Sequence, residues 1–350
     1  LLAAAGLFAS GAAVVIPPHP ADVADILRIH SGDYVDIVRR LSAPETARHV
    51  RAAEAGRYGF SAQGDNPPFA GMYEYYLLLC GAATDAVRLV HESPAGPRVS
   101  FMPAGGVNHH AMPARASGFG VFNDAAVAIA WLRERGQRVM YLDLDVHHGD
   151  GVEAAFFEDD QVLTVSFHES TRYLFPGPKG GAPEDIGAGN GRGYSVNVAF
   201  PPYTGDDAWL WAFEEIVPPL YHAFAPDLLL VQLGADGYHA DPLAHLLLTT
   251  HAYETAARRL AHLTGRRLAA LGGGGYDVLA TPRIWALEFA VLAGILGEPP
   301  ASGSPWEDLR DAPGSVPTPS RSVLEHVRQG AEDSVATIKR LVFPRHGLAP

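Results

Sequence analysis

The stretch that decides the fold covers residues 138–151 and reads RVMYLDLDVHHGDG. It begins as an apolar run, which is typical of a strand buried on both faces of a parallel sheet. It then turns polar, and because side chains two residues apart in an extended chain project to the same side, Asp143, Asp145 and His147 form one row. Such a row of carboxylate and imidazole groups suits a divalent metal. We therefore predict a metal site at the carboxyl end of a buried strand.

Outward from this stretch, apolar runs alternate with amphipathic segments of helical period. The pattern predicts helices over 123–135 and 206–224, the first opened by an asparagine cap and the second by acidic residues. It predicts strands at residues 98–102, 138–144, 161–167, 193–198, 227–233 and 267–271. The alternation predicts an α/β fold, a single domain with a central, mostly parallel β-sheet flanked by helices.

We expect residues 1–300 to form this domain and residues 301–350 to be a C-terminal extension packing on it, because the helical segment 320–341 is too short for a second domain. The uncharged segment 1–16 lacks the basic region of a secretory signal and is shorter than a membrane span of about 20 residues. We expect the sequence to begin inside the domain instead. Loops are predicted from Gly and Pro content at 58–71, 170–192 and 299–319.

The composition limits the partners and the kind of metal site. The 350 residues are 47% hydrophobic, enough for a large core, and carry 26 Lys and Arg against 39 Asp and Glu, a net charge of −13. Nucleic-acid binding needs clustered basic residues, so we expect no nucleic-acid partner. Because the apolar N-terminal segment is too short to span a bilayer, we also expect no membrane partner. The one cysteine, Cys80, permits no internal disulfide and no cysteine-based zinc site, which fits the cytoplasm. A metal site must therefore use some of the 16 His together with carboxylates.

A histidine doublet follows the first predicted strand, where the sequence reads PAGGVNHH up to His110. Adjacent imidazoles can reach a shared cleft as acid/base groups or metal ligands. Each needs a carboxylate to fix its tautomer, and Asp143 and Asp150 are available for His109 and His110.

Two more polar clusters follow the fifth and sixth predicted strands. Residues 232–243 read QLGADGYHADPL, and one of these aspartates can complete a three-ligand metal site. Residues 271–276 read LGGGGY, which lacks the lysine of a P-loop and the glycine spacing of a dinucleotide-binding loop. Tyr276 is then the functional candidate, as a donor to a developing oxyanion. Aromatic residues at 117–119 and 173–177 can form the walls of a narrow apolar channel.

Taken in this order, the motifs resemble the histone deacetylase family, and most closely its bacterial acetoin-utilization, AcuC-like branch. The resemblance runs from about residue 21 to about residue 285. The matching stretches are GGVNHHAMPARASGFGVFND, YLDLDVHHGDG, TVSFHES, YLFPG, GRGYSVNV, QLGADGYHADPL and LGGGGYD. The resemblance implies an arginase/deacetylase-like fold and a metal-dependent hydrolase that converts Nε-acetyl-lysine to lysine and acetate.

The same resemblance implies the metal ligands. Asp145, His147 and Asp236 match the three protein ligands of a catalytic Zn²⁺, and their hard oxygen donors make Fe²⁺ an alternative. A structural K⁺ is also implied, held by Asp143, Asp145, His147, Ser166 and the backbone of Phe167.

Catalytic and substrate-binding roles are implied residue by residue. His110, supported by Asp150, matches the general base and later acid. His109, paired with Asp143, matches the second histidine, and Tyr276 matches the tyrosine that polarises the acetyl carbonyl. The substrate-binding positions implied are Phe119 and Phe175 as channel walls, the Gly118 carbonyl near the substrate nitrogen, and Asp65 and Leu243 at the rim.

Two departures from the family pattern lead to expectations. Family members usually begin with another strand and an arginine-bearing turn near the acetate-release pocket, and the given sequence starts after that point, so we expect stability and acetate exit to be affected. Pro242 stands where some nuclear members carry an arginine that contacts inositol phosphate, so we expect no such regulation.

Three alternative functions are weighed against the deacetylase. An acetylpolyamine amidohydrolase shares the metal site but usually carries a long early insertion, which is absent here, so we favour an acetylated protein or peptide such as acetyl-CoA synthetase. A two-manganese ureohydrolase needs an aspartate at the position of Gly149. A non-catalytic acetyl-ligand binding protein would lack a ligand or the tyrosine, and none is missing. The sequence leaves the oligomeric state open.

Overall fold

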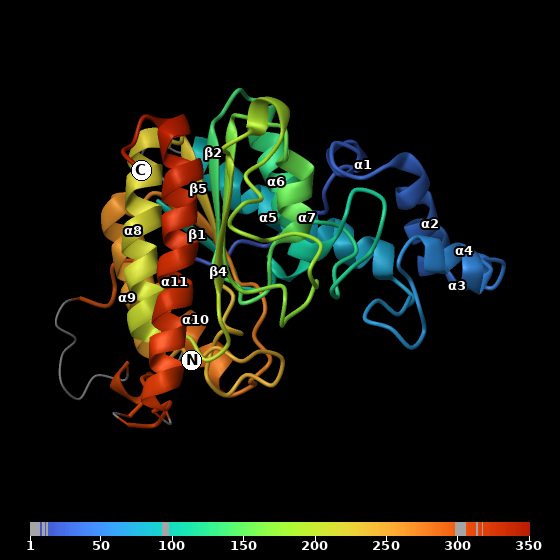
Figure 1. Cartoon of the computed structure of the whole chain (residues 1–350). Coiled ribbons are helices and arrows are strands. Elements are labelled where there is room, and N and C mark those ends of the chain that lie inside the picture. The colour runs from blue at the N-terminus through green and yellow to red at the C-terminus, as the bar shows by residue number, and fades with distance from the viewer. Residues whose placement is uncertain are drawn as a thin grey trace.

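The computed structural model shows an α/β domain (Figure 1). It describes Phe8, Gly11 and residues 13–92, 98–297, 306–312, 314–316 and 318–350. Much of the N-terminal segment 1–16, much of the predicted loop 299–319 and the boundary expected at residue 300 therefore lie outside the described residues.

In the described part of the chain, six strands form one sheet in the order β1-β6-β5-β2-β3-β4, and all neighbouring pairs are parallel. The predicted central, mostly parallel sheet flanked by helices is confirmed. The strands are β1 (Val99–Met102), β2 (Val139–Asp143), β3 (Val162–Glu169), β4 (Ser195–Phe200), β5 (Leu228–Gln232) and β6 (Leu268–Leu271).

Strand β3 runs two residues beyond its predicted end at residue 167, because polar groups after that point find partners. His168 Nε2 lies 2.9 Å from the carbonyl oxygen of Gly181, and Glu169 accepts a hydrogen bond from the His245 backbone at 2.9 Å. Pairing with β4 therefore continues to the end of that strand, with Glu169 beside Phe200.

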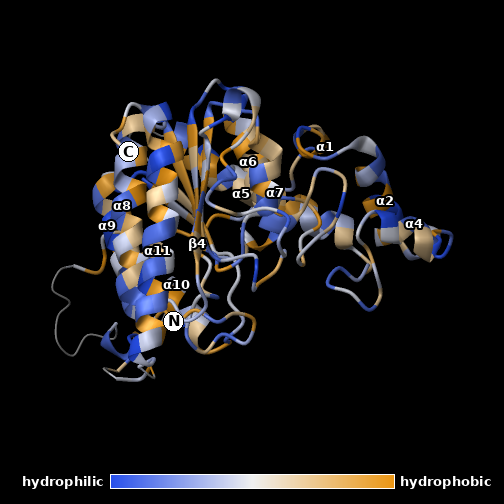
Figure 2. Ribbon diagram, in the orientation of Figure 1, coloured by the Kyte–Doolittle hydropathy of each residue, from blue (hydrophilic) through white to orange (hydrophobic). Residues whose placement is uncertain are grey.

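Four long helices cover one face of the sheet, where Met140 and Leu142 belong to the same buried cluster as Phe213 of the first helix (Figure 1). Side chains along a strand point alternately to the two faces of the sheet. Met140 and Leu142 of β2 therefore belong to the cluster on this face, and the residues between and before them belong to the cluster on the opposite face. Figure 2 shows the apolar strands enclosed between helices that are hydrophilic outside. The helices on this face are α8 (Asp206–Phe224), α9 (Thr250–Leu263), α10 (Ala280–Leu292) and α11 (Arg321–Leu341).

The C-terminal segment predicted as helical over 320–341 forms the single helix α11, which begins after the cap Ser320. The side chains of Ala331, Val335 and Ile338 join the main core. The Ser334 hydroxyl accepts a hydrogen bond from the backbone N–H of Ala199 in β4 at 3.1 Å. This helix is therefore part of the packed structure, although its separation as an extension stays a prediction.

Three helices cover the opposite face, packing against Val139, Tyr141 and Leu230. They are α5 (Met72–Glu92), α6 (Asp124–Arg133) and α7 (Asp150–Phe156). Beyond them, a group of short helices surrounds the buried Tyr34 and projects away from the sheet (Figure 1). This group comprises α1 (Val23–Ile26), α2 (Gly32–Ser42), α3 (Pro44–Ala47) and α4 (Ala52–Arg57).

Parallel pairing places the carboxyl ends of the strands at one edge of the sheet. The segments after β1, β2, β5 and β6 start from this edge, and they contain the polar clusters that the sequence singled out. Among the described residues, no helix is both long and apolar enough to cross a bilayer.

One carboxyl group in the core sets a pH dependence of stability. Glu288 of α10 is fully buried, and within the described structure neither of its side-chain oxygens has a hydrogen-bond partner. Burial raises its pKa well above the ordinary value, so the folded protein keeps a proton that the unfolded chain releases. Stability conferred by this proton is present at low pH and is lost as the pH rises above the pKa of the unfolded chain.

We expect Glu288→Gln to remove this contribution, because the amide does not titrate. Urea unfolding between pH 5 and pH 8 should show the variant gaining stability relative to wild type by up to about 1.4 kcal/mol per pH unit. Glu184→Gln, at an exposed position, is the control and should follow wild type. A constant difference between Glu288→Gln and wild type across this range would contradict the prediction.

Candidate metal centre

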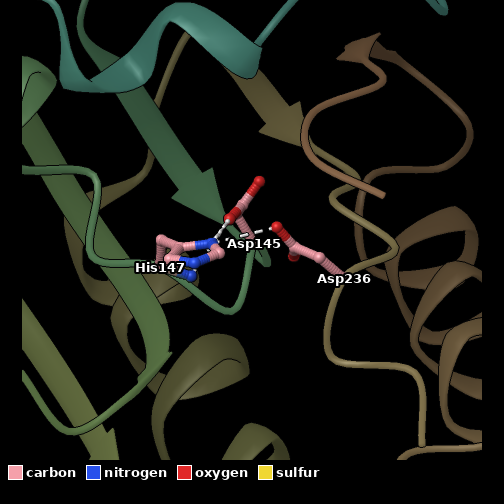
Figure 3. A group of neighbouring side chains, drawn as sticks. All are labelled: Asp145, His147 and Asp236. Carbon is pink, nitrogen blue, oxygen red and sulfur yellow. Dashed lines mark hydrogen bonds and ion pairs between the residues drawn. The ribbon is translucent and has the colours of Figure 1, made fainter. Parts of the chain in front are cut away.

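Three buried side chains converge beyond the carboxyl ends of two adjacent strands (Figure 3). Asp145 and His147 follow β2, and Asp236 follows β5, which pairs with β2. His147 Nδ1 lies 3.2 Å from Asp145 Oδ1 and 3.1 Å from Asp236 Oδ2. One ligand atom of each residue lies within 4.8 Å of the other two, so the structure brings the three predicted metal ligands together.

Each carboxylate has one oxygen held by other parts of the chain and the other oxygen beside the His147 imidazole, and in Asp145 this second oxygen also accepts a hydrogen bond from the His147 backbone at 3.0 Å. Asp145 Oδ2 accepts hydrogen bonds from Gln232 Nε2 and from the Gly274 backbone, both at 2.7 Å. Asp236 Oδ1 accepts one from the Val146 backbone at 2.8 Å. The remaining oxygens, Asp145 Oδ1 and Asp236 Oδ2, are those nearest the imidazole. These contacts hold both carboxylates in place with one oxygen of each beside the His147 ring.

The electrostatics of the three groups favour a cation. Burial and the neighbouring Asp145 raise the pKa of Asp236, and the two carboxylates raise the pKa of His147 despite its burial. Two buried carboxylates this close are costly unless a positive charge compensates them. A tetrahedral ion with bonds of about 2.0–2.2 Å separates its ligand atoms by about 3.3–3.6 Å, close to the spacing around His147. The donor set therefore fits a divalent metal.

The glycine run after β6 makes room for these carboxylates. A Cβ at Gly274 would lie 2.1 Å from Asp236 Oδ2 and 2.9 Å from Asp145 Oδ2. Gly273 has a φ of +109°, which side-chain-bearing residues rarely adopt. Close approach to the metal ligands thus explains Gly274, while Gly273 lies against the Gln232 side chain that holds Asp145.

The histidine doublet lies in the single 3-10 turn Val107–His110, and each ring contacts its own aspartate. His109 Nδ1 is 2.9 Å from Asp143 Oδ2, and His110 Nδ1 is 2.7 Å from Asp150 Oδ1. The phenol of Tyr141 donates to Asp143 Oδ2 at 2.7 Å. The pairing expected from sequence is therefore the one observed.

The two imidazoles differ in charge although their centroids lie only 4.0 Å apart. Burial disfavours the charged form of His109, but Asp143 and Asp145 outweigh this and raise its pKa to about 9. Burial and the adjacent His109 lower the pKa of His110 to about 4, against the effect of Asp150. At neutral pH, His110 is thus the neutral ring that can accept a proton.

Tyr276 faces the same centre from the end of the glycine run. Its ring lies 6.5 Å from that of His147, and its backbone N–H donates to Asp241 Oδ2 at 2.8 Å. Burial, together with Asp236 and Asp145, raises the pKa of its phenol well above the ordinary value. The hydroxyl therefore keeps its proton and remains a hydrogen-bond donor.

Aromatic side chains stand beside these groups. Phe175 packs edge-on against His110 at 4.8 Å between centroids, and Phe119 packs against Tyr276 at 5.9 Å. Both are partly exposed, 38% and 43% respectively. Gly118 lies against the His110 ring, where a Cβ would come within 2.3 Å of Cδ2. The candidate channel residues thus surround the histidine and the tyrosine.

The two predicted rim residues connect to the centre indirectly. Leu243 is 41% exposed, and its backbone donates to Asp241 Oδ1 at 2.9 Å, while the other oxygen of Asp241 holds Tyr276. Asp65 is exposed, and its neighbour Asn66 donates from Nδ2 to the Gly120 carbonyl at 3.0 Å. Both positions therefore sit on segments tied to the candidate channel.

The residues expected to hold K⁺ are only partly joined by contacts. Asp143 and Ser166 are register partners on β2 and β3, and Phe167 is buried beside them. The Ser166 hydroxyl lies 2.9 Å from His168 Nδ1. The potassium site stays a prediction.

Two orienting residues were not assigned a role from the sequence. Gln232 fixes Asp145, and Asp241 fixes both Tyr276 and Leu243. Both lie in the quoted stretch 232–243. For Gln232 the sequence did contain a signal, namely a polar amide at the end of the otherwise apolar strand β5. A buried amide needs a hydrogen-bond partner, which indicates a role in holding a neighbouring polar group.

Comparison with known proteins gives a family. The model of the histone deacetylase domain matches residues 1–292. The acetoin utilization protein AcuC of Bacillus subtilis is 38% identical over 287 residues, covering 80% of this chain and 72% of the relative. AcuC of Staphylococcus xylosus is 34% identical, covering 83% and 74%.

Solved structures agree with the sequence relatives. A histone deacetylase homologue from Aquifex aeolicus is 30% identical, with a TM-score of 0.77 over 93% of this chain and 88% of that one. A histone deacetylase homologue complexed with SAHA is 29% identical with a TM-score of 0.78 and the same coverage. The resemblance inferred from the motifs is thus confirmed. The chain belongs to the histone deacetylase family and is a deacetylase-type amidohydrolase similar to AcuC.

Proposed function

We propose that the protein hydrolyses Nε-acetyl-lysine in proteins or peptides, releasing lysine and acetate. The observation that carries the proposal is the juxtaposition of three metal-binding side chains with a neutral histidine and a protonated tyrosine. These groups supply a cation site, a base and an oxyanion donor within one cluster, the combination that amide hydrolysis requires. Phe119 and Phe175 beside them suit the apolar stem of a lysine side chain.

Asp145, His147 and Asp236 would hold the catalytic metal, for which we propose Zn²⁺, with Fe²⁺ as the alternative. When bound, such an ion polarises the substrate carbonyl and lowers the pKa of water toward 7. The two carboxylates explain why iron stays a candidate, since hard oxygen donors suit it. A structural K⁺ at Asp143, Asp145, His147, Ser166 and Phe167 is also part of the proposal.

His110 acts as the base in this scheme. Its neutral ring accepts the proton of the attacking water, while Asp150 holds the opposite nitrogen and stabilises the imidazolium that forms. The same ring then gives this proton to the leaving lysine amine. His109, raised in pKa by Asp143, adds positive charge beside the reacting carbonyl.

Tyr276 donates a hydrogen bond to the oxyanion of the tetrahedral intermediate. Asp241 holds the backbone of this residue, and the packing of Phe119 limits where the ring can lie. Preorganisation of this kind lets a donor act without reorganising at the moment of reaction.

The substrate class is proposed from the relatives and the motifs. Acetylated proteins such as acetyl-CoA synthetase are the leading substrates, as the resemblance of the motifs to the AcuC-like branch implies. The lone buried Cys80 supports a reducing compartment such as the cytoplasm. Acetylated polyamines and ligand binding without turnover are the alternatives that the experiments below separate.

Tyr276→Phe should lower kcat for an acetyl-lysine peptide by about 10² to 10³, as for the loss of one oxyanion donor. The ring and its packing against Phe119 remain, so unfolding by urea should be unchanged. Acetate release measured at saturating substrate tests this. An unchanged kcat would remove Tyr276 from the mechanism.

Asp236→Ala should lose the metal, because one of three protein ligands disappears and Asp145 is left without its partner carboxylate. After chelation and reloading with Zn²⁺ or Fe²⁺, bound metal measured by elemental analysis should fall far below the wild-type content, and acetate release should vanish. Metal should also raise the melting temperature of wild type, but not that of Asp236→Ala, since binding stabilises the folded state. Asp333→Ala, on the exposed surface of α11, should behave as wild type.

The same assay run with acetyl-lysine peptide and with an acetylated polyamine identifies the substrate class. Faster turnover of the peptide supports the proposal. Faster turnover of the polyamine would reassign the substrate, and full metal binding without release of acetate from either compound would favour the binding protein.

A further inference from the structure

The channel wall is carried by a tight turn in an unusual conformation. Ser117 and Gly120 pair in antiparallel fashion, with the Ser117 N–H donating at 3.0 Å and the Gly120 N–H at 2.8 Å. The two residues between them, Gly118 and Phe119, have φ of +48° and +66°. Positive φ at both central positions is the pattern of a type I′ turn, which favours Asn-Gly. A phenylalanine at the second position is strained there.

The turn lies directly against the histidine doublet and Tyr276, where it forms part of the channel wall. A Cβ at Gly118 would lie 2.3 Å from His110 Cδ2, and one at Gly120 would lie 2.9 Å from Asn108 Cα. The ring of Phe119 meets that of Tyr276. A shift of this turn would therefore move one wall of the channel.

Two side chains from outside the catalytic cluster hold the turn in place. The Tyr76 hydroxyl, on helix α5, donates to the Phe119 carbonyl at 2.9 Å. Asn66 Nδ2 donates to the Gly120 carbonyl at 3.0 Å. Both donors are buried, Tyr76 at 7% and Asn66 at 5% exposure. Strained backbone persists only where its surroundings fix it, and these two hydrogen bonds supply part of that restraint.

We propose that Tyr76, assisted by Asn66, is a positioning residue that holds the Gly118–Phe119 turn and thereby sets how tightly the channel binds the substrate side chain. Neither residue touches the metal ligands or the reacting groups by any contact in the described structure. The assignment of a substrate channel rests on the proposed function, whereas the restraint of the turn does not.

The effect should fall on KM rather than on kcat. Phe119 contacts the apolar stem of the substrate equally before and during the reaction, so a loosened wall removes uniform binding. Loss of one neutral hydrogen bond in Tyr76→Phe should raise KM about three- to tenfold. The change in kcat should stay within about twofold, because the metal ligands, His110 and Tyr276 keep their own partners.

The experiment compares Tyr76→Phe with Tyr75→Phe in steady-state hydrolysis of an acetyl-lysine peptide. Tyr75 is the matched control, since it is the adjacent tyrosine on α5, is 49% exposed, and its hydroxyl makes no hydrogen bond within the described structure. Tyr75→Phe should keep wild-type KM and kcat, and Asn66→Ala should raise KM as Tyr76→Phe does. A KM for Tyr76→Phe equal to that of the control, or a fall in kcat at unchanged KM, would overturn the proposal.

Hydrogen exchange provides a readout that needs no catalysis. In Tyr76→Phe, the amides of Ser117 and Gly120 should exchange at least about threefold faster, while those in the middle of α5 keep their wild-type rates. Unchanged exchange in the turn would also overturn the proposal. If exchange accelerates but wild type does not hydrolyse the peptide, the restraint by Tyr76 stands and the proposed function fails.

Discussion

The metal centre depends on one electrostatic constraint, the burial of two carboxylates, Asp145 and Asp236, beside the imidazole of His147. Such a pair is unfavourable in an apolar interior unless each group is fixed by hydrogen bonds and compensated by positive charge. Much of the surrounding structure meets that requirement. Gln232, Gly274 and Val146 each donate a hydrogen bond to one of these carboxylates, and Gly274 has no room for a side chain beside them.

The parallel sheet brings together the groups that hold these two carboxylates. Because β2 lies between β5 and β3, its carboxyl end is surrounded by the ends of other strands, and segments distant in sequence meet there. Helices on both faces exclude water from the strands, and the metal-ligating groups lie at the edge where the strands end. At that edge Asp143 and Asp145 raise the pKa of His109, while burial and the adjacent His109 lower the pKa of His110.

The sequence alone predicted the elements that a short local pattern specifies, such as a buried strand or a row of metal ligands. Uninterrupted apolar runs located every strand to within two residues of its ends, and the row after β2 identified Asp145 and His147. The order of the strands was beyond such reasoning, because it depends on how helices cross the sheet. The role of Tyr76 was equally hidden, since its partner is a backbone carbonyl 43 residues away. Side-chain to backbone contacts of this kind leave no pattern in a single sequence.

Helix α11 has a consequence for how the protein behaves in concentrated solution. β4 is an edge strand, and the outward N–H of Ala199 would otherwise be available to a strand of another molecule. The hydroxyl of Ser334 occupies that donor, and the buried face of α11 covers the strand beside it. The helix therefore protects this edge from pairing with a strand of another molecule, and without α11 the Ala199 N–H would lose its Ser334 partner.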